Sequence, residues 1–483
     1  MTLARRLGRV LAAGSLAIGL TTCATNPATG GRMLSLISES QEIAMGREAD
    51  ASVVAQMGLV PDSALQRYVS DLGLRLARAS ERPNLPWTFR VVDDPIINAF
   101  ALPGGYIYVS RGILAHFNSE AELASVLGHE IGHVTARHSV QQLSKQQLAQ
   151  IGVGVAQIAA PRLGDFLGVA VAGLELLFLK FSRDDENQAD QLGLRYMRRG
   201  GYDSREMVKV YVMLERVSGA SGGGRLPDWQ STHPNPADRQ QRINSAVAGL
   251  PPDSVGTIVR RPEYLSRVDG IVFGENPRDG YFKDAQFYHP DLRFRMTFPA
   301  GWRTFNTRQV VAAQPTQEDA QILLTAGPGA TPDSAANAFF GHQAVTGRPQ
   351  RQQINGLPAV AGTFTAQTES GQTVAGAAAF VSHGGLVYEI IGMATQAGWS
   401  QHQTAITATL RSFAPLTDPA ILAVQPFRLD VIRVDRDATL TDFARRYPGP
   451  VSVSALAVMN NVDSTATLPR NSFAKRVVGR ALP

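Results

Sequence analysis

The sequence predicts an α+β fold made of three successive parts. Helical periodicity dominates residues 24–250, strand-like alternation with one helix fills residues 265–415, and a strand–helix–helix–strand pattern fills residues 427–478. Apolar residues at three- and four-residue spacing indicate helices, and alternation of apolar with polar residues indicates strands. At 483 residues the chain exceeds the length that one hydrophobic core usually supports, so two or three domains are expected.

The helical part is expected to contain a small sheet. Helices are predicted at Ser38–Met57, at Asp62–Ser80, and from a capping box at Ser119 and Glu122 to about His138. Strands are predicted at Trp87–Val92 and Phe100–Ser110, the second interrupted by Pro103-Gly104-Gly105. The apolar residues 148–181 are divided by a proline and several charges, so they are predicted to form buried helices or a lid on a membrane surface rather than a spanning helix.

Composition limits the classes of function. The chain is 44% hydrophobic and 18% charged, which is typical of a globular protein. Its net charge of +5 is modest for this length, and no dense Lys/Arg run lies beside stacking aromatic residues, so nucleic acid is not expected as a partner. The single cysteine, Cys23, excludes an intrachain disulfide and a metal site built from cysteines.

Residues 1–23 have the pattern of an export signal. Three arginines within the first nine residues precede an apolar stretch from Val10 to Leu20, which is too short to span a bilayer comfortably. Leu20-Thr21-Thr22-Cys23 resembles the lipobox of bacterial lipoproteins, although Thr22 replaces the Gly, Ala or Ser usual before the cysteine. The resemblance implies lipidation of Cys23, and Ala24 then favours the outer membrane. We therefore expect a periplasmic protein anchored to the outer membrane; plain cleavage, giving a soluble periplasmic protein, is the alternative.

The central motif is His129-Glu130-Ile131-Gly132-His133, which lies in a predicted helix. Four residues of helix rotate by about 400° and rise about 6 Å, so the two imidazoles share one face and can hold one metal ion. Glu130 lies about 100° around the helix, beside the metal position. The same five-residue pattern can also arise from two solvent-exposed histidines on a helix, or from a buried histidine with a hydrogen-bond partner. A second element, a further group of ligand residues, is therefore needed to indicate a metal site.

That second element is the pair Glu186 and Asp190 on a following helix. A zinc ion held by two imidazoles needs one more protein ligand and an open position, and a carboxylate from another helix is suitable. The two carboxylates are four residues apart and share a face. One can therefore bind the metal while the other accepts the free N–H of a ligand histidine.

These elements together resemble the M48 family of zinc metalloproteases, in particular its exported bacterial members. The similarity covers about residues 36–248 and includes the two helices, the strand motif Asn98–Gly105 and the segment Ser231-Thr232-His233-Pro234 followed by Arg239. The resemblance implies a mostly helical zincin-type, gluzincin-like peptidase domain with a small edge-strand sheet. Residues 24–250 are the expected extent of that domain.

The resemblance also implies a role for each matching residue. One zinc ion per chain is expected on His129, His133 and Glu186, with Glu130 as general base and Asp190 supporting a ligand histidine. His233 is expected either to stabilise the transition state or to cap the zinc in a latent form, and an exposed loop histidine is the simpler alternative. Arg239 is expected to stabilise the oxyanion or to give structural support. The residues expected to accept an extended peptide are Asn98, Ala99, Phe100, Gly104 and Gly105.

His138 lies nine residues after His129, on roughly the opposite side of a continuous helix, and is therefore assigned no role. The remaining histidines fall in no ligand spacing and are also left unassigned: His116, His289, His342, His383 and His402.

The second half of the chain begins after a probable linker at residues 251–264, marked by two proline-containing segments. Strands are predicted around residues 292–298, 321–325, 374–381 and 386–391, and a helix at Trp399–Phe413, so residues 265–415 form an expected α+β domain. No chemistry is assigned to this domain.

The tail, residues 427–478, is similar to a LysM glycan-binding module. The similarity lies in the strand Leu429–Val434, the run Thr439–Ala444 and the segment Leu456–Asn460. Asp437-Ala438 departs from the Gly-Asp usual in that motif. Binding of peptidoglycan and a degenerate packing role are both open.

The sequence thus predicts a zinc-dependent endopeptidase of the bacterial cell envelope, acting in protein quality control on unfolded or misassembled envelope proteins. A chaperone-like or peptidoglycan-associated scaffold, with a latent zinc site closed by His233, is the alternative. A third hypothesis makes glycan binding by the tail the main function. The presence of every ligand and of Glu130 favours the first.

Overall fold

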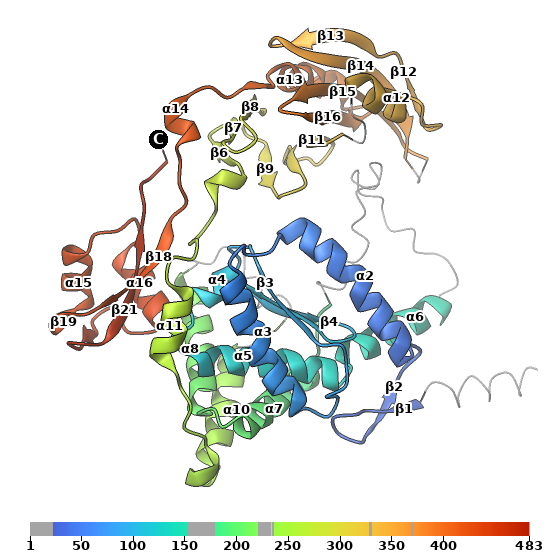
Figure 1. Ribbon diagram of the computed structural model, residues 1–483. Coiled ribbons are helices and arrows are strands. Elements are labelled where there is room, and N and C mark those ends of the chain that lie inside the picture. Colours follow the sequence, from blue (N-terminus) through green and yellow to red (C-terminus); the bar gives the residue numbers. More distant parts are fainter. Residues whose placement is uncertain are drawn as a thin grey trace, which may run out of the picture.

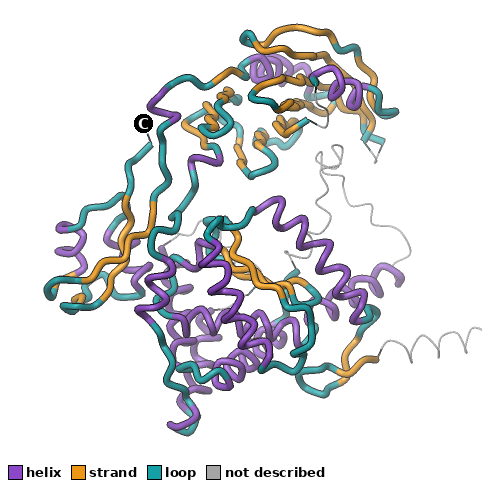
Figure 2. The backbone as a smooth tube through the Cα atoms, viewed as in Figure 1, coloured by secondary structure: helices purple, strands orange, loops and turns teal. Residues whose placement is uncertain are grey.

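The computed structural model describes residues 23–152, 179–220, 233, 236–327, 331–368 and 371–482. A helical N-terminal region is followed by a β-rich region, which confirms the α+β fold class (Figure 1). Figure 2 shows mostly helices around a small sheet in the lower part of the molecule and mostly strands in the upper part. The predicted export segment before Cys23 and most of the apolar segment 148–181 lie outside the described residues. None of the described helices is long and apolar enough to cross a bilayer.

The N-terminal region is built around a three-stranded sheet of order β3-β5-β4. β3 (Thr88–Val92) runs parallel to β5 (Tyr106–Ser110), and β4 (Ala99–Leu102) pairs antiparallel with β5 and forms one edge. α3 (Ser63–Arg78) packs against β3, and α5 (Glu120–Thr135) packs against β4. The other elements of this region are β1 (Cys23–Thr25), β2 (Arg32–Leu34), α2 (Glu39–Met57), α4 (Arg111–Leu114) and α6 (His138–Gly152).

α5 is the central helix, and every one of its residues is buried. It packs against α7 (Arg183–Arg199) and α8 (Arg205–Ala220), and α8 in turn packs against α10 (Pro236–Ala248). The Ser119 hydroxyl accepts the N–H of Glu122, as the predicted capping box requires. The Glu122 carboxylate, however, accepts the N–H of Asn118 rather than that of Ser119, so the box is only half formed.

The prediction that this helix continues to about His138 is wrong. α5 ends at Thr135, and Arg137 has a left-handed backbone with φ of 59° before α6 begins at His138. This turn separates α5 from α6 and changes the direction in which the His138 side chain points.

The β-rich region contains two sheets. A four-stranded sheet has the order β17-β8-β7-β6, and an eight-stranded sheet has the order β12-β14-β15-β16-β11-β10-β9 with β13 beside β14. Strands β15 and β16 are covered on both faces, because Ile390 packs with Ile406 of α13 while Val387 and Ile391 pack with Ala335 of α12. The bounds are β6 Tyr281–Lys283, β7 Gln286–His289, β8 Phe294–Thr297, β9 Arg303–Asn306, β10 Val311–Gln314, β11 Ala320–Ala326, α12 Pro332–Phe340, β12 Val345–Gly347, β13 Gln350–Ile354, β14 Leu357–Gln367, β15 Thr373–His383, β16 Leu386–Thr395, α13 Trp399–Arg411 and β17 Ala414–Pro415.

The chain enters and leaves this β-rich region through two adjacent backbone segments. The Phe273 N–H donates to the Phe427 carbonyl at 2.8 Å, and the Leu429 N–H donates to the Ile271 carbonyl at 2.9 Å. The preceding segment 251–264, expected as a linker, holds the short η3 (Pro252–Ser254) and the start of α11 (Arg261–Val268). α11 packs against α3 and α5. The β-rich region is therefore an insertion between α11 and the tail.

The tail has the predicted strand–helix–helix–strand order. β18 (Arg428–Arg433) pairs antiparallel with β21 (Phe473–Val478), and α15 (Leu440–Arg446), α16 (Val453–Asn460) and the short pair β19 (Ala438–Thr439) and β20 (Thr467–Leu468) lie between them in sequence. Its core is continuous with that of the N-terminal region. The buried Lys475 ammonium donates to the carbonyls of Ala115 (2.9 Å) and Phe117 (2.8 Å), directly before α5. The tail thus supports the start of the central helix.

Candidate metal centre

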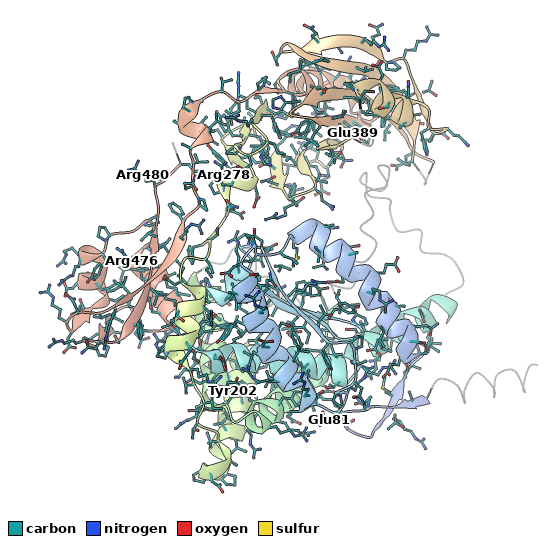
Figure 3. The ribbon with its side chains drawn as sticks, in the orientation of Figure 1. Glu81, Tyr202, Arg278, Glu389, Arg476 and Arg480 are labelled. Carbon is teal, nitrogen blue, oxygen red and sulfur yellow. The ribbon has the colours of Figure 1, made fainter. Side chains whose placement is uncertain are left out.

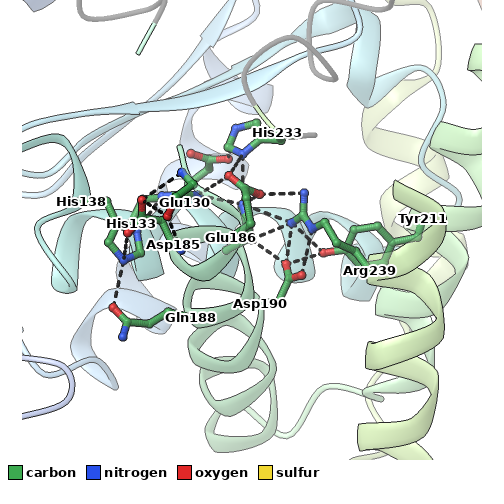
Figure 4. Close-up of polar contacts among 12 residues, drawn as sticks. Glu130, His133, His138, Asp185, Glu186, Gln188, Asp190, Tyr211, His233 and Arg239 are labelled. Atoms are coloured by element: carbon green, nitrogen blue, oxygen red, sulfur yellow. Dashed lines mark hydrogen bonds and ion pairs between the residues drawn. The ribbon is translucent and has the colours of Figure 1, made fainter. Parts of the chain in front are cut away.

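The packing of α5 on α7 is unusually close and brings the motif residues together. Gly128 and Gly132 of α5 face Gly193 and Ala189 of α7, and a Cβ added at Gly193 would lie 2.9 Å from the His129 backbone nitrogen. A Cβ at Gly128 or Gly132 would also lie only 3.0–3.1 Å from the backbone of α7. The close approach places Glu186 and Asp190 of α7 opposite His129 and His133 of α5. Figure 4 labels three of these side chains, His133, Glu186 and Asp190.

Four buried side chains converge at this helix pair: His129, His133, Glu186 and His233 each offer one ligand atom, and these atoms lie within 4.8 Å of one another. The His129 and His133 Nε2 atoms are 3.0 Å apart, and the Glu186 carboxylate oxygens lie 3.5 Å from His133 Nε2 and 3.6 Å from His129 Nε2. Zinc bonds of about 2.0–2.1 Å at tetrahedral angles separate ligand atoms by about 3.3–3.4 Å, so the set has the dimensions of a zinc site.

The protonation of the two motif histidines also suits a cation. The Asp190 carboxylate lies 2.9 Å from His129 Nδ1, so the proton of this imidazole is on Nδ1 and Nε2 carries a lone pair. Burial lowers the pKa of His133 well below its usual value, so this imidazole is neutral. Two unprotonated nitrogens 3.0 Å apart repel each other unless a cation lies between them, so the donor set fits a bound zinc ion.

Asp190 and Arg239 form a buried support behind His129. The Arg239 guanidinium donates to Asp190 from Nε at 2.9 Å and from Nη2 at 2.5 Å, and its Nη1 lies 2.8 Å from a Glu186 oxygen. The Tyr211 hydroxyl donates to Asp190 at 2.5 Å. Although burial alone would raise the pKa of Asp190, Arg239 and His129 hold it below its usual value. The structure therefore brings Asp190 and Arg239 together as partners of the ligand side chains.

His138 supports the second ligand, a role that the sequence analysis missed. Its Nε2–H donates to Gln188 Oε1 at 2.9 Å, which leaves its Nδ1 to accept the Nδ1–H of His133 at 2.9 Å. Asn26 also donates to Gln188 Oε1, at 3.5 Å, and to the Ala136 carbonyl at 3.1 Å. The break at Arg137 makes this possible, because a continuous helix would turn His138 away from His133.

Glu130 lies beside the four ligand atoms, fully buried. Its Oε1 is 3.7 Å from His233 Nε2 and has no hydrogen-bond partner among the described residues. Burial, with a contribution from the Glu186 charge, raises the pKa of Glu130 above its usual value. Glu130 is thus a basic carboxylate next to the metal position.

His233 is buried within the cluster rather than exposed on a loop. Its Nδ1 lies 2.8 Å from Glu186 Oε1 and 3.4 Å from His129 Nε2. Although burial alone would lower the pKa of His233, the carboxylates of Glu186 and Glu130 raise it. Its neighbours in the Thr-His-Pro segment lie outside the described residues. With His233 in this position the cluster offers four protein ligands, whereas a catalytic zinc site keeps one position open.

The residues expected to accept a peptide lie on and beside β4. Asn98 precedes this edge strand, Ala99 and Phe100 belong to it, and the strand packs against α5. Gly104 and Gly105 form the following turn with φ of 79° and 100°, and a Cβ at Gly104 would collide with Ile43 of α2. The turn geometry and the contact with α2 are sufficient to explain why glycine occupies positions 104 and 105. Binding of substrate by all five residues stays a prediction.

Comparison with known proteins identifies relatives of the N-terminal half. Residues 63–247 match the model of Peptidase family M48. The chain is 39% identical over 173 residues to the mitochondrial metalloendopeptidase OMA1 of Arabidopsis thaliana, which covers 35% of this chain and 33% of that protein. It is 31% identical over 227 residues to the putative beta-barrel assembly-enhancing protease of Vibrio cholerae, a match that covers 45% of this chain and 46% of that protein. It is 30% identical over 232 residues to the beta-barrel assembly-enhancing protease of Escherichia coli K12, a match that covers 46% of this chain and 47% of that protein. The match spans less than half the length of each of these relatives.

Proposed function

Because residues 63–247 match the model of Peptidase family M48, we propose that this chain is a zinc-dependent endopeptidase of that family that hydrolyses unfolded or misassembled proteins of the bacterial cell envelope. The observation that carries the proposal is the buried set of His129, His133 and Glu186 with Glu130 beside it. These residues supply three protein ligands and a base, the combination found in catalytic zinc sites.

The chain's own residues would divide the work of peptide hydrolysis. His129, His133 and Glu186 would hold a zinc ion, which when bound would supply Lewis acidity toward a scissile carbonyl and an attacking water. Glu130, buried beside the ligand atoms, would take the proton of that water and return it to the leaving amine. Asp190 and His138 hold the two ligand imidazoles in the tautomers that leave Nε2 free.

An extended peptide would be bound along β4. This strand is the edge of its sheet and packs against α5, the helix that carries the motif. Pairing through the peptide backbone lets a protease accept many sequences, because the main chain is the same in all of them. The proposed substrate class, unfolded envelope proteins, is consistent with such recognition.

The location in the envelope is part of the same proposal. It is supported by the export pattern of residues 1–23 and by the names of the bacterial relatives. Lipidation of Cys23, attachment to the outer membrane and contact with peptidoglycan through residues 427–478 are proposed with it. Mass spectrometry of the mature N-terminus tests the first, and release from insoluble peptidoglycan by soluble N-acetylglucosamine oligomers tests the last.

A second candidate function is a scaffold with a latent zinc site. The position of His233 favours it, because this imidazole offers a fourth ligand atom and would fill the position that a catalytic zinc site keeps open. Access to the metal then requires His233 to move away.

Three proteins separate the two candidates: the unaltered chain, Glu130→Gln and His233→Ala. We expect Glu130→Gln to retain one zinc per chain but to lose casein cleavage by at least a hundredfold, since general-base catalysis contributes roughly 10²–10⁴. Retained cleavage by Glu130→Gln would falsify the mechanism. Faster cleavage by His233→Ala indicates latency, and slower cleavage indicates that His233 takes part in the reaction.

A further inference from the structure

A cavity of about 650 Å³ lies in the inserted β-rich region, away from the metal centre. Its lining is mainly apolar and includes Phe294, Leu324 and Phe339. Leu292 and Leu386 also line it, although these side chains are 37% and 42% exposed. Cavities of about 300–1,000 Å³ with apolar walls are typical of ligand-binding sites. Exposed leucines beside such a cavity indicate an apolar ligand.

One carboxylate in this lining belongs to Glu389, which Figure 3 labels in the β-rich region. It has no partner in the part of the chain that the structure describes. Glu389 belongs to β16 and shares the face of the sheet on which Val387 and Ile391 pack against α12. Burial alone raises the pKa of Glu389 to about 7, and no nearby cation lowers it. A half-buried carboxylate without a partner is costly, so its presence in an apolar cavity indicates a cationic group on the ligand.

The strand next to Glu389 also has an unpaired edge. Thr325 of β11 lies opposite Glu389, and β10 pairs with β11 only from Leu324 to Ile322. Thr325 and Ala326 line the cavity and have no described strand on their outer side. An extended polypeptide can pair with such a backbone edge, whereas a small amine cannot exploit it.

The cavity lies next to the contact between the inserted region and the peptidase region. Arg308 lines the 650 Å³ cavity and also a second cavity of about 190 Å³, which Asp93, Asp94 and Pro95 line from the other side. Arg308 forms an ion pair with Asp93. Residues 93–95 lead directly into β4, the edge strand beside α5. The second cavity is therefore lined both by Arg308 of the first cavity and by the segment that precedes β4.

We propose that this cavity is a docking site for an extended segment of unfolded polypeptide that carries apolar residues and a lysine or arginine. The inference rests on the proposed peptidase function, because it assigns the site that holds a substrate outside the metal centre. The apolar residues would occupy the wall formed by Phe294, Phe339 and Leu386, and the cation would pair with Glu389.

The test measures binding in the full chain with Glu130→Gln, so that no cleavage occurs. Two fluorescein-labelled twelve-residue peptides rich in Leu and Phe are compared by anisotropy; one carries a central lysine, and the other has glutamine in its place. We expect the lysine peptide to bind roughly tenfold more tightly, the lower end of what a hydrogen bond to a charged group contributes. Glu389→Gln should abolish that difference, and Leu386→Ser should weaken both peptides alike.

Glu318→Gln is the matched control, because Glu318 lies in the same sheet region but is exposed and pairs with Arg303. It should leave both affinities unchanged. An unchanged preference for lysine in Glu389→Gln overturns the proposal, and so does Glu389-dependent binding of octylamine without binding of either peptide. The two failures are distinguishable, because cleavage of casein by Glu130→Gln removes the proposed mechanism, whereas a preference for lysine that does not depend on Glu389 removes only this docking site.

Discussion

His138 fixes the tautomer of a metal ligand through a chain of three side chains. Gln188 accepts the Nε2–H of His138, and His138 Nδ1 then accepts the Nδ1–H of His133. Loss of such an outer partner typically lowers metal affinity by 10–100-fold. We expect His138→Ala to weaken zinc binding by that factor, as measured by competition with a fluorescent chelator.

Two further variants make this prediction specific. His138→Asn should recover part of the affinity, because the Asn amide oxygen can accept the same N–H of His133. His342→Ala removes an exposed histidine outside the metal centre and should change nothing. An unaltered zinc affinity in His138→Ala would show that His133 needs no such partner.

Glu389 should make the free protein less stable as the pH rises. The pKa of its carboxyl is about 7 in the folded chain against 4.5 ordinarily, so between these values the folded state binds more protons than the unfolded state. Stability is therefore lost as the pH rises from 4.5 through 7, and the loss is complete above pH 7. Glu389→Gln should raise the free energy of unfolding by about 1–2 kcal/mol at pH 8, less than the full shift implies because water screens part of the carboxylate. At pH 5 the gain should be smaller, and urea unfolding at both pH values measures the two differences.

At the residue scale, sequence patterns predict side chains whose spacing itself carries the chemistry. His129 and His133 share a helix face, and Glu186 and Asp190 share another, so the sequence could place all four near one metal. His138 could not be predicted, because its direction depends on one left-handed residue, Arg137. Glu389 could not be predicted either, since an unpartnered carboxylate is recognised only from what surrounds it.

At the scale of elements, the contact between α5 and α7 decides the geometry of the metal centre. Gly193 has no space for a Cβ, which would lie 2.9 Å from the His129 nitrogen and 3.2 Å from the His129 Cα. Gly193→Ala should therefore separate the helices, with a loss of about 1–3 kcal/mol in the free energy of unfolding. Zinc affinity should fall with it, because Glu186 and the histidines belong to different helices.

Gly219→Ala in α8 is the control for helix propensity. Nothing lies within 4 Å of a Cβ at that position, which is the last but one of α8, so the substitution should not destabilise the chain and should stabilise it by at most about 0.5–1 kcal/mol. Equal stability and equal zinc affinity of the two variants would contradict the role assigned to the close helix contact.

Most helices and strands could be predicted because their patterns are local. α2, α3 and α13 follow apolar periods, and β11, β15 and β16 follow apolar runs bounded by turn residues. The end of α5 could not be predicted, because no Gly or Pro marks the turn at Arg137. The glycines in α5 and α7 were visible, but only the packing shows that they face each other.

At the scale of the whole molecule, regions that follow one another in the sequence are not always the regions that pack together. The sequence predicts three parts in succession, yet the tail returns to the N-terminal region and shares its core. The inserted region has separate cores of its own. Contacts between distant segments, such as that of Lys475 with Ala115 and Phe117, leave no local pattern and so could not be predicted.

The arrangement predicts opposite outcomes for two deletions. Residues 275–425 can be replaced by a four-residue Gly-Ser turn, because Phe273 and Phe427 are already hydrogen-bonded neighbours at 2.8 Å and a short loop closes two antiparallel segments. The shortened chain should fold cooperatively and bind one zinc, since its core contains no residue of the insertion.

A chain that ends at Leu416 should instead aggregate or unfold at lower temperature, because it loses β18, β21 and the bonds of Lys475 to the carbonyls before α5. Thermal unfolding and zinc content measure both outcomes. Loss of the fold in the first variant with its retention in the second would mean that the insertion, not the tail, supports the helix that carries His129 and His133.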